Sequence, residues 1–321
     1  MDIMELNRIQ ELSKSIKENI EKVIVGKADT IDLILTALLA NGHILLEDVP
    51  GTGKTMLAKA LAKSIDADFK RIQFTPDLLP SDITGLNYYN QKQGEFTFRS
   101  GPVFTNILLA DEINRATPRT QSSLLECMEE KQITIDGETR KLSQPFLVIA
   151  TQNPIETAGT FPLPEAQLDR FLMQLSMGTV SAREEFTILN RFLQDSPLEE
   201  LKSVCSKEDL LEMQKSIRKI YVHPSLMDYM IAIVHKTRDH KNIALGVSPR
   251  GSLAFLRATQ AYAAVHGLSF VTPEIIQKVA PCVLTHRLIL RSSYNLQESA
   301  KELVESIVAQ TAVPTENFNN K

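Results

Sequence analysis

Residues 45–55 read Leu-Leu-Glu-Asp-Val-Pro-Gly-Thr-Gly-Lys-Thr, and this stretch decides the fold. Its apolar start is typical of a buried strand, and the residues that follow it have the spacing of a helix. The glycines at the turn let the backbone close into a nest of N–H groups, and the following helix directs its positive end to the same point. The stretch therefore predicts a P-loop that binds the phosphates of a nucleotide. A glycine-rich turn without a ligand is the alternative.

Side chains of this loop have defined roles in that prediction. Lys54 would reach the β- and γ-phosphates, and the Thr55 hydroxyl would join the coordination of Mg²⁺. Asp48 stands where the G-x-x-x-x-G-K-T pattern has its first glycine. A carboxylate there would weaken binding, so Asp48 is expected to point away from the phosphates or to be paired. The loop residues predicted to contact the nucleotide are Pro50, Gly51, Thr52, Gly53, Lys54, Thr55 and Met56.

A second apolar run, residues 107–112, ends in the paired carboxylates Asp111 and Glu112. In a parallel sheet, ligands lie outside the carboxyl ends of the strands, so this pair would face the phosphate site. Asp111 can hold Mg²⁺, and Glu112 can accept a proton from the attacking water. A third run ends at Asn153, which could orient that water, although Asn153-Pro154 alone is more typical of a turn. An acidic pair alone is more often a solvated loop; together with the P-loop it predicts hydrolysis.

Short apolar runs alternate with helical patterns in the first half of the chain, which predicts an α/β fold with a five-stranded parallel sheet. The expected strands are His43–Glu47, Phe69–Phe74, Ile107–Ala110, Phe146–Ala150 and Phe171–Leu175. Residues 87–99 and 132–141 have the pattern of two inserted hairpins. The apolar residues from Leu6 to Val23 recur at helical spacing, so an N-terminal helix should pack on this domain.

The second half is expected to be all-α. From about Thr179 helical patterns follow one another, so we expect a core domain over residues 1–178, a helical lid over 179–321 and a short hinge near Gly178. The expected helices centre on residues 186–193, 226–234, 253–265, 275–290 and 303–308. The tail after Thr311 is expected to fray.

Composition excludes several classes of protein. The chain has 321 residues, 43% hydrophobic and 23% charged, with a formal charge of −4, so nucleic acid is not the default partner. Three dispersed cysteines favour reduced thiols in a cytoplasmic protein over a disulfide or zinc framework. No apolar stretch is long enough for membrane insertion. His235 and His240 are five residues apart, which does not place both on one helical face as metal ligands.

Taken together, these motifs resemble the AAA+ ATPases and, more closely, their MoxR family. The resemblance covers nearly the whole chain. It is carried by Val25-Gly26, the loop at 48–55, Asp-Glu-Ile-Asn-Arg-Ala at 111–116, Thr-Gln-Asn-Pro at 151–154, Phe-Pro-Leu-Pro-Glu-Ala-Gln-Leu-Asp-Arg-Phe at 161–171 and Val-Ser-Pro-Arg-Gly at 247–251.

The resemblance implies roles for further residues. Val25 and Gly26 would lie beside the adenine of ATP, and Asn153 would be the sensor 1 residue. Arg250 would be the sensor 2 residue supplied by the lid. Arg170 would be an arginine finger that reaches a neighbouring subunit, with Arg115 as a second candidate; a surface salt bridge is the alternative for Arg170.

The resemblance also implies a biological role. A homo-oligomer, a ring of six subunits, would use ATP and Mg²⁺ to remodel or mature protein complexes, often with a partner that carries a von Willebrand factor A domain. Two other hypotheses stay open. One is a nucleotide-gated module that binds a protein without steady turnover. The other is a nucleic-acid motor, for which the hairpin at 132–141 offers little net positive charge.

Overall fold

The computed structural model describes residues 2–153, 159–193, 197–291 and 299–314. Its centre is a five-stranded sheet in the order β2-β5-β8-β1-β9, and every neighbouring pair is parallel. The strands are β1 (Ile44–Glu47), β2 (Phe69–Gln73), β5 (Ile107–Asp111), β8 (Leu147–Gln152) and β9 (Met173–Leu175). The predicted α/β fold with a five-stranded parallel sheet is confirmed.

The central strands β1, β5 and β8 are buried on both faces, because they are apolar up to the polar residues at their C-terminal ends. Leu46 faces a core shared with the N-terminal and lid helices, whereas its neighbour Leu45 faces a second core. That second core contains Leu124 and Leu125 of α5 (Pro118–Glu130). A strand covered on both faces shows no alternation of polar and apolar residues, which is why these strands are continuous apolar runs in the sequence.

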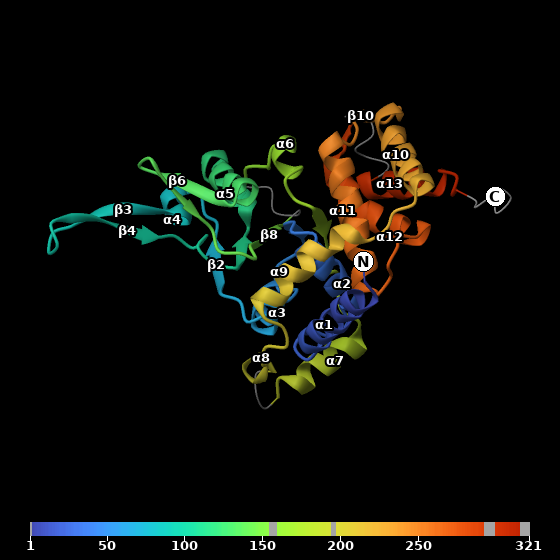
Figure 1. The fold of residues 1–321 in the computed structure, drawn as a ribbon. Helices are drawn as coiled ribbons and strands as arrows, with labels where there is room; N and C mark the ends of the chain where they lie inside the picture. The colour runs from blue at the N-terminus through green and yellow to red at the C-terminus, as the bar shows by residue number, and fades with distance from the viewer. Residues whose placement is uncertain (1, 154–158, 194–196, 292–298, 315–321) are drawn as a thin grey trace.

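Helices and two hairpins complete the first domain (Figure 1). The helices are α1 (Ile3–Glu21), α2 (Ala28–Leu39), α3 (Lys54–Ser64), α4 (Pro80–Thr84), α5 and α6 (Glu165–Leu168). The predicted hairpins are confirmed as β3 (Gly85–Asn90) with β4 (Glu95–Ser100), and β6 (Gln132–Ile135) with β7 (Glu138–Lys141). They contact each other: Asn87 donates to Asp136 at 2.8 Å, and the Arg140 guanidinium lies 4.1 Å from the centre of the Phe98 ring.

The second half is mainly helical, with seven α-helices among its described residues where five were expected, and with two further differences from expectation. Its helices are α7 (Ala182–Arg191), α8 (Pro197–Glu200), α9 (Lys207–Ser216), α10 (Pro224–Asp239), α11 (Pro249–Val265), α12 (Pro273–Leu284) and α13 (Ala300–Ala309). The helix expected to reach residue 290 ends at Leu284. The chain beyond it becomes extended as β11 (Ile289–Leu290), which pairs antiparallel with β10 (Ile243–Leu245), so the expectation of no strands was wrong.

The N-terminal helix α1 contacts both halves of the chain. It packs on α3 of the first domain, as expected, and also on α11 of the second. No helix among the described residues is long and apolar enough to cross a membrane. Pro154 and residues 315–321, where fraying was expected, lie outside the described residues.

Candidate functional site

The loop after β1 has the backbone of a phosphate-binding turn. Gly51 and Gly53 have φ angles of 85° and 88°, a region that costs a glycine little and strains other residues. Helix α3 begins directly after them, at Lys54, so its N-terminal N–H groups face the loop. The Lys54 ammonium donates to the carbonyl oxygens of Asp48 (3.2 Å) and Val49 (2.9 Å). The lysine is thus folded over the loop, where a phosphate oxygen could replace these acceptors.

The unusual Asp48 points away from this loop, as its charge requires. It is buried, and its carboxylate accepts hydrogen bonds from Ser176 Oγ (2.7 Å) and from the backbone N–H groups of Met177 (2.6 Å) and Gly178 (3.2 Å). These partners lie after β9, at the expected hinge. The expectation that Asp48 is paired is met by the structure.

The P-loop and the acidic strand end meet at one cavity of about 280 Å³. They meet because β5, β8 and β1 are parallel neighbours, so their carboxyl ends share one edge of the sheet. The lining residues are Asp48, Pro50, Gly51, Thr52, Gly53, Lys54, Thr55, Met56, Arg71, Gln73, Asp111, Glu112, Thr151, Gln152 and Asn153. The structure therefore brings together the predicted loop residues, both carboxylates and Asn153.

Thr151 positions the two carboxylate residues. Its hydroxyl donates to Asp111 Oδ1 at 2.6 Å and accepts from the backbone N–H of Glu112 at 2.9 Å. Glu112 has a φ of 55°, which is strained for a residue with a side chain and turns the chain sharply after β5. The Thr151 hydroxyl is therefore a fixed bridge between the two acidic residues.

A second, more apolar cavity of about 400 Å³ continues from the P-loop. It shares Pro50 to Gly53 and Met56 with the first cavity and adds apolar side chains including Val25, Ile188 and Phe192. Gly26 has a φ of 72°, and a Cβ there would lie 1.9 Å from the Glu184 carboxylate. Val25 of the predicted Val25-Gly26 pair thus lines a cavity in which a flat apolar group bonded to the phosphates would fit.

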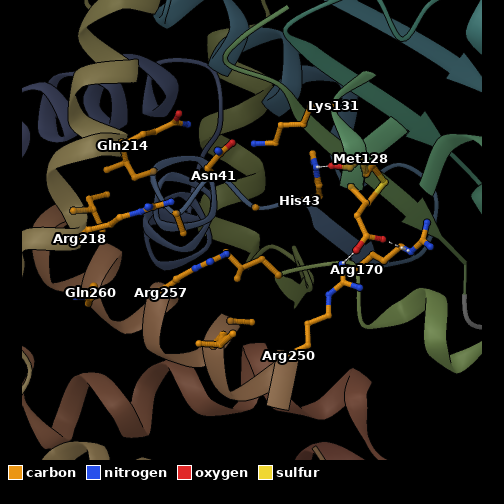
Figure 2. Close-up of a pocket in the computed structure, with 18 of the residues that line it drawn as sticks. Asn41, His43, Met128, Lys131, Arg170, Gln214, Arg218, Arg250, Arg257 and Gln260 are labelled. Carbon is orange, nitrogen blue, oxygen red and sulfur yellow. Dashed lines mark hydrogen bonds and ion pairs between the residues drawn. The ribbon is translucent and has the colours of Figure 1, made fainter. Parts of the chain in front are cut away.

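Arg170 and Arg250 lie away from both of these cavities. Arg170 Nε is 3.1 Å from Glu129 Oε2, and a terminal nitrogen of Arg250 is 3.0 Å from Glu129 Oε1. Figure 2 shows the two arginines converging on this carboxylate at one end of a different cavity. The side chains of Arg170 and Arg250 are 29% and 45% exposed, so both remain accessible from outside.

Asp169 explains why Arg250 lies beside Arg170. It accepts from Ser248, the N-cap of α11, at 2.9 Å and from buried Arg287 at 2.6 Å. These contacts fix the start of α11 next to the end of α6. Arg250 therefore does not line the phosphate cavity of its own chain.

Arg115, the second candidate for a finger, is held within its own site. Its Nε lies 3.0 Å from Glu112 Oε2, the same oxygen that accepts from Gln73 at 2.8 Å. Within one chain, Arg115 therefore lies beside Glu112.

Comparisons with known proteins agree with this geometry. The model of the ATPase family associated with various cellular activities (AAA) matches residues 43–173, and that of the AAA lid domain matches residues 235–307. The chain is 52% identical over 300 residues to YeaC of Bacillus subtilis (strain 168), covering 93% of this chain and 94% of YeaC. It is 42% identical over 319 residues to the chaperone MoxR1 of Mycobacterium tuberculosis, covering 96% of this chain and 84% of MoxR1. The chain belongs to the MoxR family of AAA+ ATPases.

The fold of this MoxR-family chain also matches a solved structure over almost its full length. A crystal structure of a candidate ATPase from Cytophaga hutchinsonii superposes with a TM-score of 0.91 at 39% identity. The match covers 97% of this chain and 98% of that one. The core and lid are therefore arranged alike in both proteins.

The residues of the MoxR-family site fit a magnesium ion. Mg²⁺ prefers oxygen ligands and usually takes one or two from the protein, with the rest from water and phosphate. Thr55 and Asp111 supply such oxygens at one cavity. Within the described part of the chain, no group of three or more His, Cys, Asp or Glu side chains could hold a metal ion by itself. This pattern fits a metal that arrives with a phosphate ligand.

Two residues of β2 that the sequence did not predict also line the cavity. Arg71 forms an ion pair with Asp111 at 2.6 Å, and Gln73 contacts Glu112. The only indication of them in the sequence is that the expected strand Phe69–Phe74 contains polar residues. Their meaning depends on the strand order, because only the pairing of β2 with β5 places them beside the acidic pair.

Proposed function

We propose that this MoxR-family chain binds and hydrolyses ATP with Mg²⁺ and couples hydrolysis to the remodelling of protein complexes. One observation carries the proposal: the P-loop, Asp111, Glu112 and Asn153 line one cavity, and that cavity continues into the apolar one that contains Val25. The first fits the triphosphate of ATP, and the second fits its base.

The P-loop would hold the substrate through charge and backbone donors. The N–H groups of residues 51–55 would surround the phosphates, and Lys54 would exchange its two carbonyl acceptors for β- and γ-phosphate oxygens. Thr55 and Asp111 would hold Mg²⁺, which neutralises charge that develops on the phosphates. The Arg71 guanidinium, 2.6 Å from Asp111 Oδ2, helps hold this carboxylate in place.

Glu112 and Asn153 would act on the attacking water. The water oxygen bonds to the γ-phosphorus, the bond from that phosphorus to the β–γ bridging oxygen breaks with its electron pair going to ADP, and Glu112 accepts the water proton. Asn153 would orient the water through its amide. Thr151 acts as a positioning residue because it holds both acidic residues in place.

Arg170 and Arg250 would complete a neighbouring subunit's site. They are paired, partly exposed and distant from the cavity of their own chain, so a ring with nucleotide between subunits gives both a γ-phosphate to contact. A guanidinium stays charged and offers planar donors, and an arginine finger contributes about 10³ to 10⁵ in rate. A ring of six subunits is the assembly proposed here.

The name of one relative supports the remodelling role. The M. tuberculosis relative is named a chaperone, which supports a protein client for this chain. A partner with a von Willebrand factor A domain and a cytoplasmic location belong to the same proposal. Loss of the γ-phosphate would change contacts to Arg170 and Arg250 together, so hydrolysis can move neighbouring subunits.

Three substitutions test the hydrolysis proposal. Lys54→Ala should abolish ATP binding in calorimetric titrations, whereas Lys59→Ala, at an exposed lysine of the same helix, should leave it unchanged. Glu112→Gln should bind ATP and retain it without turnover, and the proteins that this variant captures from a lysate would identify clients. Steady phosphate release by Glu112→Gln at the wild-type rate would contradict the role given to Glu112.

Mixed rings test whether Arg170 acts on a neighbour. Arg170→Ala and Lys54→Ala proteins should each be inactive, and a mixture should regain activity where an intact P-loop meets an intact Arg170. A mixture of Lys54→Ala with the double variant Lys54→Ala/Arg170→Ala is the control and should stay inactive. Absence of recovery in rings shown to be mixed would refute action between subunits.

A further inference from the structure

A cavity of about 730 Å³ lies at the junction of the core and the lid. Its walls come from the turn between α2 and β1, the end of α5, the α9 region and α11. Arg170 and Arg250 occupy one end. Figure 2 shows Lys131, Arg218 and Arg257 extending from three different elements toward another part of the same opening.

Positive charge dominates this cavity. Seven of its lining residues are basic: Lys131, Arg170, Lys215, Arg218, Arg250, Arg257 and Arg287. Two are acidic, and both are engaged, since Glu129 pairs with Arg170 and Arg250 while Asp169 pairs with Arg287. The whole chain has a formal charge of −4, so the excess of positive charge is a local property of this cavity.

Among the described residues, no carboxylate lies within 4 Å of Lys131, Arg218 or Arg257. Lys131 belongs to the core and Arg257 to the lid. Burial lowers the pKa of Lys131, and the nearby charge of Arg257 lowers it further. Two like charges from separate domains thus face each other across a cavity, an arrangement that a bound anion would stabilise.

Hydrogen bonds to backbone atoms hold the walls of the cavity. Gln214 of α9 donates to the carbonyl of Leu38 at the end of α2 (2.7 Å), and Gln260 of α11 donates to the carbonyl of Ile220 (2.8 Å). The Gln260 bond joins the segments that carry Arg218 and Arg257, and the Gln214 bond joins α9 to α2. The end of α5, which carries Lys131, is held to the turn after α2 by His43, whose Nε2 lies 3.0 Å from the carbonyl of Met128. The positive groups are therefore presented on a fixed frame, which reduces the entropy lost when a ligand binds.

We propose that this cavity binds a free anion with several linked phosphate groups, held by Lys131 from the core and by Arg218 and Arg257 from the lid. Guanidinium groups match phosphate oxygens with paired donors, and the ammonium of Lys131 adds a point charge. The volume lies within the range of about 300–1,000 Å³ typical of small-molecule sites. The site is distinct from the P-loop and goes beyond the proposed ATPase function.

Such a ligand would tie the core to the lid. It would compensate the repulsion between Lys131 and Arg257 and so favour the arrangement of domains seen here. Because Arg250 lies on α11 with Arg257, the anion would also stabilise the placement of Arg250 beside Arg170. The cavity would act as an effector site that fixes the position of the lid.

The test uses the full chain with Lys54→Ala, which removes binding at the P-loops of the protein and of its neighbours. Inorganic tripolyphosphate is titrated calorimetrically into this protein and into the same protein carrying Arg257→Glu or Lys131→Gln. We expect tripolyphosphate to bind the Lys54→Ala protein. Its affinity should fall about tenfold or more when Arg257→Glu or Lys131→Gln is added. Lys301→Glu, at an exposed lysine of α13, makes the same change in net charge as Arg257→Glu and should retain the affinity.

Thermal unfolding provides the control for folding. Without ligand, Arg257→Glu should unfold no earlier than its parent, because the new carboxylate faces Lys131. Tripolyphosphate should raise the unfolding temperature of the parent and of Lys301→Glu but not of Arg257→Glu. If Arg257→Glu proves unstable, Arg218→Gln takes its place.

A second titration with ATP identifies the kind of phosphate chain: tighter binding than tripolyphosphate indicates a nucleotide, and equal binding indicates the bare chain. The proposal is overturned if Lys54→Ala protein binds neither, or if the cavity variants bind as tightly as Lys301→Glu. It is also overturned if a poly-glutamate peptide binds and tripolyphosphate does not. None of these outcomes depends on whether the wild-type protein hydrolyses ATP.

Discussion

His43 should contribute to stability in a pH-dependent way. It is buried at the start of β1, where its Nε2 lies 3.0 Å from the carbonyl of Met128 and its Nδ1 accepts from the backbone N–H of Val148 at 3.0 Å. Both ring nitrogens are thus used by one neutral tautomer, with the proton on Nε2. Burial lowers the pKa of His43 from 6.5 to about 4.

The sign and size of the effect follow from this pKa. Below pH 6.5 the unfolded chain binds a proton at His43 that the folded chain does not bind until about pH 4. The stability that neutral His43 contributes is therefore fully present above pH 6.5 and is lost as the pH falls toward 4. The pKa of His43 differs by about 2.5 between the unfolded and folded chains, which corresponds to about 3 kcal/mol of unfolding free energy. About 2 kcal/mol of this is lost between pH 7.5 and pH 5.

Urea denaturation of wild-type and His43→Gln proteins at pH 7.5 and pH 5 measures this loss. The variant should be the less stable at pH 7.5, and the difference in unfolding free energy should shrink by about 2 kcal/mol at pH 5. Other groups that titrate in this range, including buried His286, are present in both proteins and cancel. His235→Gln, at an exposed histidine, controls for the loss of an imidazole. A difference that is the same at both pH values would refute the assignment of a buried neutral ring.

Three further predictions concern the nucleotide site. Thr151→Val removes the hydroxyl between the two acidic residues, so the rate of ATP hydrolysis, measured by phosphate release, should fall about tenfold or more. Thr151→Ser keeps the hydroxyl and should stay near the wild-type rate. Equal rates for both variants would count against a positioning role. Gly26→Ala brings a Cβ onto the Glu184 carboxylate at a positive φ and should weaken ATP binding in calorimetry. Gly94→Ala is at a similar φ, and its Cβ would meet only the Tyr89 hydroxyl at 4.0 Å, so it should leave the affinity unchanged. Asp48→Ala leaves the N–H groups after β9 without their acceptor and should lower the free energy of unfolding in urea by about 2–4 kcal/mol; a loss below 0.5 kcal/mol would show that water replaces the carboxylate.

The core of the fold could be predicted because its signals are local. Each buried strand is a short apolar run, and the turn that contains Asp136-Gly137 lies where the sequence placed it. The pair β10–β11 could not be predicted, because these strands are two and three residues long and join segments far apart in the sequence. Helices α8 and α9 were also missed. A short helix such as α8 offers too few turns for apolar residues to recur.

The same division separates the parts of the candidate site. The P-loop and the acidic pair were found because each is a strand followed directly by its functional residues. Arg250 required knowledge of packing, since its place beside Arg170 depends on the contacts of Asp169 with Ser248 and Arg287. Those contacts join residues about 80 and 118 positions apart, and no local pattern in the sequence encodes them.

Asp48 lies between these two cases. Chemistry alone requires a carboxylate beside a triphosphate to be paired or directed away, and this part of its behaviour followed from one residue. The identity of its partners did not, because Ser176, Met177 and Gly178 come together with it only when β9 adds to β1. Asp48, which replaces the first glycine of the loop, therefore binds the backbone of the segment after β9, where the chain passes from the core toward the lid. A buried carboxylate with three donors holds its position more firmly than a glycine could, since a displacement would leave charge and N–H groups unpaired. The phosphate loop is therefore bonded directly to the segment that follows β9, whereas Arg250 lies at the start of α11, which Asp169 holds through Ser248.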